Sequence, residues 1–347
     1  MPLDKIRVGF IGAGKNTRKM HIPKFQALPG VELTEVANRT LASGAKVARE
    51  YSIQRACSSW QEIVASTHVD AIIIGTWPYL HCEATCAALN SKKHVLCEAR
   101  MAMNLSEAQQ MQEAAQAHPN LISQLVPAPV TLHADKTIRT YIEQGRLGRL
   151  LYFHADYHSN SMSSPNGLLH WRRNKKYSGE NTMFLGIIYE TIQRWIPPAK
   201  KIMAVGNIFN DKSLDPETGE IVTIEIPDYL SVQMEMENGI CGSFLITETN
   251  LHPPPPTINI YGTEGSLKID FVPDGKLWYG TKMDDSLQEV KIKPEDKGYW
   301  RVEEEFINAI QGKEKVHLTT FDSGVSYMRF TQNVMDSYRE GGQTKFL

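Results

Sequence analysis

The sequence predicts an α/β domain with a doubly wound parallel sheet, followed by an α+β domain whose sheet is open and mostly antiparallel. Three observations lead to this fold class. A short apolar strand near the N-terminus runs directly into a glycine-containing turn. Strand and helix patterns then alternate as far as about residue 125, as they do in parallel sheets. After Pro127-Ala128-Pro129 the pattern changes to longer strands joined by turns, so we expect domains at residues 1–126 and 127–347.

The first strand, residues 6–11, is apolar and β-branched, and it ends at Gly12-Ala13-Gly14-Lys15-Asn16-Thr17. In a dinucleotide-binding turn the first glycine permits a tight bend and the second lets the backbone approach a pyrophosphate. The next helix then presents free N–H groups to the anion. Thr17 stands where the fingerprint has its third glycine, which predicts slightly looser packing of helix on strand. A plain strand–turn–helix corner gives the same local pattern. We expect a dinucleotide bound by Gly12, Gly14, Lys15, Asn16 and Thr17.

The second strand, residues 31–37, ends about twenty residues after this turn, where a site for NAD(H) has Asp or Glu on the ribose hydroxyls. The chain has Asn38-Arg39-Thr40 instead. A carboxylate would repel a 2′-phosphate, whereas an amide, a guanidinium and a hydroxyl can all bind one. An ordinary polar loop is the alternative. The sequence therefore favours NADP(H) over NAD(H), with Asn38, Arg39 and Thr40 in the cofactor site.

The rest of the first domain continues the alternation. A buried strand is expected at residues 69–75, followed by a turn at Trp77-Pro78 and a helix over about 81–91. Short strands follow at 94–97 and 121–125, separated by a helix that begins near Asn104. Ser106 and Gln109 have the spacing of a capping box for that helix.

The second domain begins with a helix over about 134–144. Its strands are expected at 150–157, 201–207, 229–237, 240–249, 257–262 and 266–271. The turn Glu237-Asn238-Gly239 is typical of a hairpin. Two helices, at about 300–311 and 323–339, complete the chain within this domain.

Composition excludes several functional classes. The 347 residues are 41% hydrophobic and 22% charged, with a net charge of −2, and contain no basic stripe for nucleic acid. No run approaches the roughly 20 apolar residues of a membrane span, and no signal peptide is evident. The five cysteines lack a Cys-x-x-Cys pair, so we expect reduced thiols, no metal and a cytoplasmic location.

Several short motifs occur in the order found in one known family. They are Gly9-Phe10-Ile11-Gly12-Ala13-Gly14, His21-Ile22-Pro23, Leu28-Pro29-Gly30-Val31-Glu32-Leu33, Thr76-Trp77-Pro78 with His81, Lys93-His94-Val95-Leu96-Cys97-Glu98, Gly145-x-x-Gly148, Trp171-Arg172 and Ile260-Tyr261-Gly262-Thr263-Glu264-Gly265-Ser266. Together they resemble the glucose–fructose oxidoreductase/inositol dehydrogenase (Gfo/Idh/MocA) family over essentially the whole chain.

The resemblance implies a Rossmann domain that binds a nicotinamide cofactor, and a second domain whose open sheet forms a homodimer or homotetramer. Substrates in the family are usually sugars, inositols or their derivatives. The resemblance also implies cofactor contacts from Glu98 and Ala99, and it places one turn beside the nicotinamide. That turn carries Thr76, Trp77, Pro78 and His81, and for His81 the alternative is a role at the start of the following helix.

Two family motifs are altered. The family has Glu-Lys-Pro where this chain has Glu98-Ala99-Arg100, so the Lys that contacts substrate and ribose is missing. The family's Asp-x-Gly-x-His-x-x-Asp helix corresponds to residues 184–191, where Phe184, Ile188 and Thr191 replace Asp, His and Asp. An aliphatic side chain cannot accept the hydroxyl proton that is lost when an alcohol is oxidised.

Either other side chains replace the missing groups or the chemistry does not need them. Tyr189, His158 and His170 are the candidate proton donors, since a phenol or an imidazole can transfer a proton. Arg100 keeps a positive charge but cannot act as a base. Substrate contacts are expected from Arg100, Trp171, Arg172, Tyr157 and Glu190. For Tyr189 the alternative is packing in the core, and for the two histidines it is exposure or a backbone hydrogen bond.

Four functions remain open on the sequence. The first is an NADP(H)-dependent oxidoreductase that acts on a carbohydrate-like or polyol metabolite with a non-standard proton donor. The second is a reductase of a conjugated C=C or C=N bond, which needs less help from a Lys/His pair. The third is a redox-neutral lyase or glycosidase that uses the cofactor transiently. The fourth is a cofactor-binding regulator without catalysis. The expected partners are a small-molecule substrate and further copies of the chain, with neither nucleic acid nor membrane.

Overall fold

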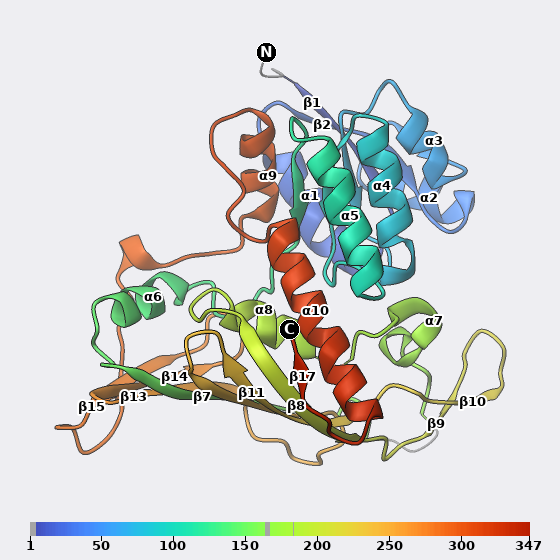
Figure 1. Ribbon diagram of the computed structural model, residues 1–347. Coiled ribbons are helices and arrows are strands. Elements are labelled where there is room, and N and C mark those ends of the chain that lie inside the picture. Colours follow the sequence, from blue (N-terminus) through green and yellow to red (C-terminus); the bar gives the residue numbers. More distant parts are fainter. Residues whose placement is uncertain (1–4, 164–166, 183) are drawn as a thin grey trace. The chain divides into compact units, whose positions relative to one another are not determined.

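The computed structural model describes residues 5–163, 167–182 and 184–347. The chain forms two compact units, each assembled from two stretches of sequence (Figure 1). Unit 1 contains residues 1–127 and 301–328, and unit 2 contains residues 128–300 and 329–347. The first change of unit lies one residue from the expected boundary. The return of residues 301–328 to unit 1 differs from the expectation that the second domain continues to the end.

Unit 1 is built on a six-stranded sheet in the order β3-β2-β1-β4-β5-β6, in which every pair of neighbours is parallel. The strands are β1 (Ile6–Ile11), β2 (Val31–Ala37), β3 (Arg55–Cys57), β4 (Ala71–Ile74), β5 (His94–Cys97) and β6 (Ser123–Leu125). This order is that of the Rossmann fold, and it confirms the predicted doubly wound sheet. Of the two central strands, β4 is buried throughout and β1 is buried except at Arg7, because both faces of the sheet are covered by helices (Figure 1).

The helices of unit 1 connect these strands. They are α1 (Ile22–Ala27), α2 (Leu41–Glu50), α3 (Trp60–Ala65), α4 (His81–Asn90) and α5 (Leu105–Ala117), with a π-helical turn η1 (Thr17–His21) and a 3₁₀ turn η2 (Pro78–Leu80). The expected capping box of α5 is wrong by two residues. Asn104 is the N-cap, and its side chain accepts a hydrogen bond from the Glu107 N–H at 2.9 Å.

The returning segment adds α9 (Val302–Ile310) to unit 1 and extends the edge of its sheet. Beyond β6, Leu125 and Thr319 exchange backbone hydrogen bonds of 2.9 and 3.2 Å. The Gln124 side chain donates to the Leu318 carbonyl at 2.7 Å. Helix α10 (Phe321–Arg339) then begins in unit 1 and ends in unit 2.

Unit 2 contains a nine-stranded sheet in the order β16-β15-β14-β13-β7-β12-β11-β8-β17. All neighbours are antiparallel except β7 and β12, which confirms the predicted mostly antiparallel sheet. Its strands are β7 (Leu150–His158), β8 (Ala199–Asn207), β11 (Tyr229–Met236), β12 (Cys241–Thr247), β13 (Thr257–Gly262), β14 (Gly265–Asp270), β15 (Leu277–Thr281), β16 (Gln288–Glu289) and β17 (Lys345–Phe346).

The helices of unit 2 lie over one face of this sheet (Figure 1). They are α6 (Asp135–Glu143), α7 (Lys175–Ser178), α8 (Leu185–Ile192) and the second half of α10, with 3₁₀ turns η3 (Trp171–Arg173) and η4 (Pro294–Asp296). A separate hairpin of β9 (Lys212–Leu214) and β10 (Ile221–Thr223) was not predicted. The other face of the sheet carries exposed Met203, Val205, Tyr152 and Tyr261. In the described part of the chain, no helix combines the length and apolar character needed to cross a membrane.

Candidate functional site

The turn after β1 has the geometry of a phosphate-binding loop. Gly12 has a φ of +84°, and its N–H donates to the Ala37 carbonyl at 2.8 Å. A Cβ on Gly12 would lie 2.5 Å from Thr76 Cγ2, so the turn requires glycine for both conformation and space. Gly14, Lys15 and Asn16 follow on the exposed side of the turn. The backbone of this turn is therefore accessible to an anion.

Thr17 does not loosen the turn, contrary to the expectation. It is buried, and its hydroxyl donates to the Gly12 carbonyl at 3.1 Å. A Cβ on the neighbouring Gly75 would lie 2.1 Å from Thr17 Oγ1. Close packing is retained because the glycine needed there is supplied by the end of β4 instead. Thr17 thus stabilises the loop from inside and is not accessible to a ligand.

The three residues after β2 have different roles. Asn38 Oδ1 accepts a hydrogen bond from the Ala13 N–H at 2.7 Å, and Asn38 Nδ2 donates to Ser43 Oγ at 3.0 Å. Thr40 is the N-cap of α2 and accepts from the Ser43 N–H at 3.3 Å. Arg39 is exposed. Asn38 therefore ties the end of β2 to the phosphate turn, and Arg39 is the side chain that extends to solvent beside it.

The turn after β4 carries the second predicted group of cofactor residues. Thr76 Oγ1 donates to the Trp77 carbonyl at 3.2 Å, and Pro78 begins η2. His81 is fully buried, with Nδ1 2.9 Å from the Arg100 carbonyl oxygen and Nε2 3.1 Å from that of Thr76. Burial lowers its pKa. The expected cofactor contact of His81 is therefore replaced by a structural role that joins this turn to the segment after β5.

Glu98 follows β5 and lies beside the phosphate turn. Its Oε1 accepts from Asn16 Nδ2 at 2.5 Å, and its Oε2 accepts from the Ala99 N–H at 3.3 Å. His21 Nε2 is 2.9 Å from Glu98 Oε1, and His21 Nδ1 is 2.7 Å from Glu303 Oε1 on α9. In the sequence, His21 stands out only as part of the motif His21-Ile22-Pro23, and Glu303 belongs to no motif. No sequence signal links them, because they are 282 residues apart.

Ionisation in this cluster follows from the hydrogen bonds. Burial opposes the charge on His21, but its bonds to Glu303 and Glu98 outweigh that cost and raise its pKa to about 9. Burial likewise opposes the charge on Glu98, and the bonds from His21 and Asn16 keep its pKa below the ordinary value. The cluster is thus an imidazolium between two carboxylates.

Arg100, the residue at the position of the family proline, is buried, with 3% of its surface exposed. Its carbonyl oxygen lies 2.9 Å from His81 Nδ1. Because this side chain is buried in the structure, the structure gives no support for the predicted substrate contact of Arg100.

Tyr189 lies in the core of unit 2, which corrects its prediction as a proton donor. Its side chain is fully buried and its ring stacks on Phe330 with centroids 3.7 Å apart. Its hydroxyl oxygen accepts from the Ala199 N–H at 2.8 Å, and burial raises its pKa to about 12. The side chain cannot reach a substrate from this position. Tyr189 is therefore a packing residue of the core, which was the alternative to its role as a proton donor.

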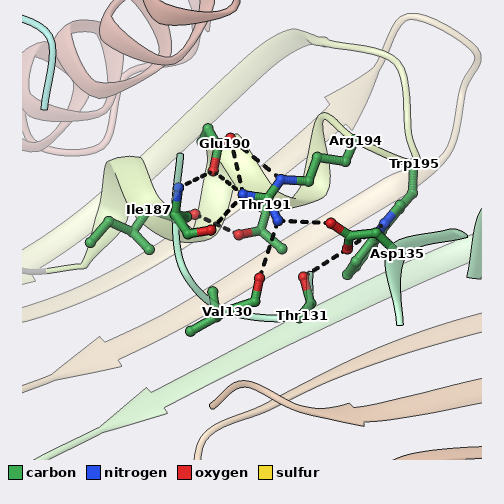
Figure 2. Close-up of polar contacts among 9 residues, drawn as sticks. Val130, Thr131, Asp135, Ile187, Glu190, Thr191, Arg194 and Trp195 are labelled. Carbon is green, nitrogen blue, oxygen red and sulfur yellow. Dashed lines mark hydrogen bonds and ion pairs between the residues drawn. The ribbon is translucent and has the colours of Figure 1, made fainter. Parts of the chain in front are cut away.

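Glu190 is also buried and is part of a structural ion-pair network (Figure 2). Arg194, one turn later, donates to Glu190 Oε2 at 2.8 Å and to Asp135 Oδ2 on α6 at 2.9 Å. It also donates to the carbonyls of Ala128 and Val130, at 2.8 and 3.1 Å. The predicted substrate contact of Glu190 is corrected accordingly, because this carboxylate holds α8 to the segment at the start of unit 2.

Tyr157 and His158, both expected near the substrate, lie on different faces of the unit 2 sheet. Side chains alternate along β7, so Tyr157 and His158 point to opposite faces of the sheet. Tyr157 stacks on Phe184 at the start of α8, with ring centroids 4.1 Å apart. His158 lies on the other face, where its Nδ1 is 3.0 Å from Asn250 Nδ2 and its Nε2 is 3.7 Å from Asp156 Oδ1. His158 and Tyr157 therefore cannot contact one substrate, which corrects their joint assignment.

The segment around η3 is close to Tyr157. The Arg172 guanidinium lies 4.3 Å from the ring centroid of Trp171, and its charge acts on the Tyr157 hydroxyl. His170 is exposed, and its Nδ1 accepts from the Arg172 N–H at 3.3 Å. Partial burial and the Arg172 charge lower the pKa of His170. Of the three predicted proton donors, only His170 is exposed. It lies two residues from Arg172, whose charge acts on Tyr157.

A further carboxylate, Glu248, was missed. It follows β12, is buried, and acts with burial to raise the pKa of Tyr157 to about 12. No sequence motif marks it, because Thr247-Glu248-Thr249 resembles an ordinary strand end. Within the described residues, no group of three or more His, Cys, Asp or Glu side chains is arranged to hold a metal ion.

Comparison with known proteins gives a consistent picture. Residues 6–125 match the Gfo/Idh/MocA oxidoreductase family with an NAD-binding Rossmann fold, and residues 136–268 match a C-terminal domain of the same family. Levoglucosan dehydrogenase from Pseudarthrobacter phenanthrenivorans is 25% identical over 285 residues, which cover 76% of this chain and 72% of that protein. A 1,5-anhydro-D-fructose reductase from Ensifer adhaerens is 32% identical over 182 residues, half of each chain.

Solved structures resemble the whole chain. A structure of levoglucosan dehydrogenase in complex with NADH and L-sorbose matches with a TM-score of 0.84 and 20% identity, covering 99% of this chain and 98% of that one. At this identity the match describes the fold. It extends through both units.

Proposed function

The chain belongs to the Gfo/Idh/MocA family of oxidoreductases that bind a nicotinamide dinucleotide, and from this premise we propose that it uses NADP(H) in hydride transfer to or from a carbohydrate-like metabolite. The observation that carries the proposal is the phosphate turn with Asn38 bonded to it and Arg39 exposed beside it. When bound, the cofactor supplies or accepts the hydride, according to the direction of the reaction. The protein supplies its orientation and a group that transfers the accompanying proton.

The preference for NADP(H) rests on charge at the end of β2. No carboxylate stands at the position that binds the ribose hydroxyls in NAD(H) sites, and an exposed guanidinium is the side chain that can pair with a 2′-phosphate. Isothermal titration with NADPH and NADH tests this directly. We expect Arg39→Ala to weaken NADPH binding at least tenfold and to leave NADH binding nearly unchanged. Equal losses for both cofactors would contradict the assignment. Arg49→Ala is the control, because Arg49 is an exposed arginine of the same unit, near the end of α2.

For the substrate we propose an alcohol or carbonyl of a sugar-like molecule, as in the names of the two relatives above. We propose His170 as the proton carrier, because Tyr189 is in the core and His158 lies on the far face of the sheet. A lowered pKa keeps this imidazole neutral near pH 7, as required of a base in alcohol oxidation. His170→Asn should lower kcat about 10²- to 10⁴-fold with cofactor affinity unchanged. A wild-type kcat would exclude the role.

A second function is favoured by one observation. Phe184, the half-buried residue just before α8, stacks on Tyr157 at a position where the family has a carboxylate. An aromatic pair suits a flat, unsaturated substrate, whose C=C or C=N bond accepts hydride without the missing Lys and His. Parallel screens of sugars, their carbonyl derivatives and conjugated substrates, followed at the nicotinamide absorbance, separate the two. Product without net absorbance change indicates a redox-neutral reaction, and binding without turnover indicates a regulator.

We also propose that two or four copies associate through the exposed face of the unit 2 sheet. The apolar side chains Met203 and Val205 on β8 and the stacked Tyr152 and Tyr261 support this interface, because monomers seldom expose such a group. Light scattering after gel filtration should give a dimer or tetramer, and Val205→Lys should shift it toward monomer. A monomeric wild type would contradict the proposal.

A further inference from the structure

The imidazole of His21 occupies an unusual position for a side chain next to a phosphate turn. It is fully buried at the end of η1, and each ring nitrogen is within hydrogen-bond distance of a carboxylate oxygen. Ionised carboxylates only accept hydrogen bonds, so an imidazole that bonds to two of them must donate from both nitrogens. Such an imidazole carries a proton on each nitrogen and a positive charge.

The charges around His21 are balanced. Glu98 faces it from the segment after β5 and Glu303 faces it from α9. Lys24 Nζ on α1 lies 3.9 Å from Glu303 Oε2 and supplies a second positive charge. His81, whose ring nitrogens lie beside carbonyl oxygens, and the buried thiol of Cys97 are also near Glu98. With His21 protonated, two positive charges face two negative ones. If His21 lost its proton, the two negative charges of Glu98 and Glu303 would be balanced in this cluster by the single positive charge of Lys24.

The same cluster reaches the cofactor loop through one atom. Glu98 Oε1 accepts from both His21 Nε2 and Asn16 Nδ2, so the orientation of this carboxylate determines where the Asn16 amide lies. Asn16 is part of the phosphate turn, two residues after Gly14. A change at His21 is therefore transmitted to the loop by a chain of two hydrogen bonds, without contact between His21 and the cofactor.

We propose that His21 is a cationic positioning residue for the cofactor, which holds Glu98 and through it Asn16 in the binding geometry of the phosphate turn. The inference rests on nucleotide binding at this turn but not on a preference for NADP(H). It predicts that cofactor affinity is constant near neutral pH and falls in alkaline solution as His21 loses its proton. Above its pKa of about 9, the dissociation constant rises up to about tenfold per pH unit.

Titration of NADPH and NADH from pH 6.5 to 10 tests the proposal, with three variants. His21→Gln keeps a hydrogen-bond donor and removes the charge, and it should weaken the cofactor about tenfold at pH 7 and abolish the alkaline transition. Glu303→Gln removes one of the two carboxylates that favour the charge, so it should move the transition to lower pH. His68→Gln, at an exposed histidine of the same unit, should leave affinity and pH profile unchanged.

A purely structural role for His21 would lower stability without moving the transition in Glu303→Gln. An unchanged pH profile in that variant would therefore overturn the proposal, even where His21→Gln fails to fold. The ring nitrogen resonances of His21 give a reading that does not depend on the cofactor. They should be those of an imidazolium up to about pH 9, and a neutral ring at pH 7.5 would equally overturn it. Failure of the wild type to bind either nucleotide would instead contradict nucleotide binding itself.

Discussion

Removal of the Arg194 side chain should destabilise unit 2 more than any other single loss in the network of Figure 2. The guanidinium is buried and donates to two carboxylates and two carbonyls. In Arg194→Met the apolar volume is largely kept, but Glu190 and Asp135 become buried charges without a cation. Each retains a neutral donor, the Ala128 N–H for Glu190 and the Trp195 indole for Asp135.

The magnitude follows from these contacts. Breaking a buried ion pair by removing one partner costs about 3–5 kcal/mol, and the presence of two carboxylates places this variant at the upper end. Glu190→Gln keeps the size of the side chain and leaves Arg194 paired with Asp135, so it should cost about 1–2 kcal/mol. Arg139→Met changes an exposed residue on α6 and should cost less than about 0.5 kcal/mol.

Urea unfolding followed by tryptophan fluorescence and far-UV circular dichroism measures all three variants. Trp195, one of the six tryptophans, is part of the network, since its indole donates to Asp135 at 3.1 Å, so part of the fluorescence signal comes from this region. The expected order of unfolding free energies is wild type, then Arg139→Met, Glu190→Gln and Arg194→Met. A loss below 1 kcal/mol in Arg194→Met would refute the reasoning, because the buried carboxylates would then be hydrated or protonated at little cost.

Three further predictions concern the core and the cofactor turn. Tyr189→Phe should cost about 1–3 kcal/mol in unfolding free energy, because the Ala199 N–H loses its acceptor, while kcat stays within about threefold of wild type; a collapse of kcat in a stable variant would restore Tyr189 as a proton donor. Gly12→Ala should abolish cofactor binding in titration, since its Cβ would meet Thr76 and its φ is positive, and retained affinity would show that the turn does not hold the pyrophosphate. The raised pKa of His21 contributes stability that is complete below about pH 6.5 and lost as pH rises through about 9, roughly 3 kcal/mol in all, so the difference in unfolding free energy between wild type and His21→Gln should shrink over that range; parallel curves would contradict it.

The fold could be predicted because the signals for it are local. The apolar runs of β1 and β4, the turn at Gly12 and the hairpin turn before β12 depend on neighbouring residues, and the structure has each of them. The place of α9 could not be predicted in this way. Its amphipathic pattern gives a helix but does not say which sheet it joins, and the answer depends on contacts such as that of Glu303 with a histidine 282 residues earlier.

The site was harder to predict, for two physical reasons. The motif around residues 184–191 identifies a helix, but the buried side of that helix is set by tertiary packing, which placed Tyr189 against Phe330. Alternation along a strand was available from the sequence alone and would have separated Tyr157 from His158. The role of Thr17 depended on Gly75 at the end of another strand, which no local pattern reports.

The divided sequence of unit 1 has a consequence for synthesis of the protein. The residues that complete it, 301–328, leave the ribosome after residues 128–300, which form most of unit 2. The six parallel strands can assemble earlier, but the contact between His21 and Glu303 forms only when α9 has emerged. A nascent or truncated chain therefore has an unfinished support beneath its phosphate turn. We expect full nucleotide affinity to be acquired only after residues 301–328 have been synthesised.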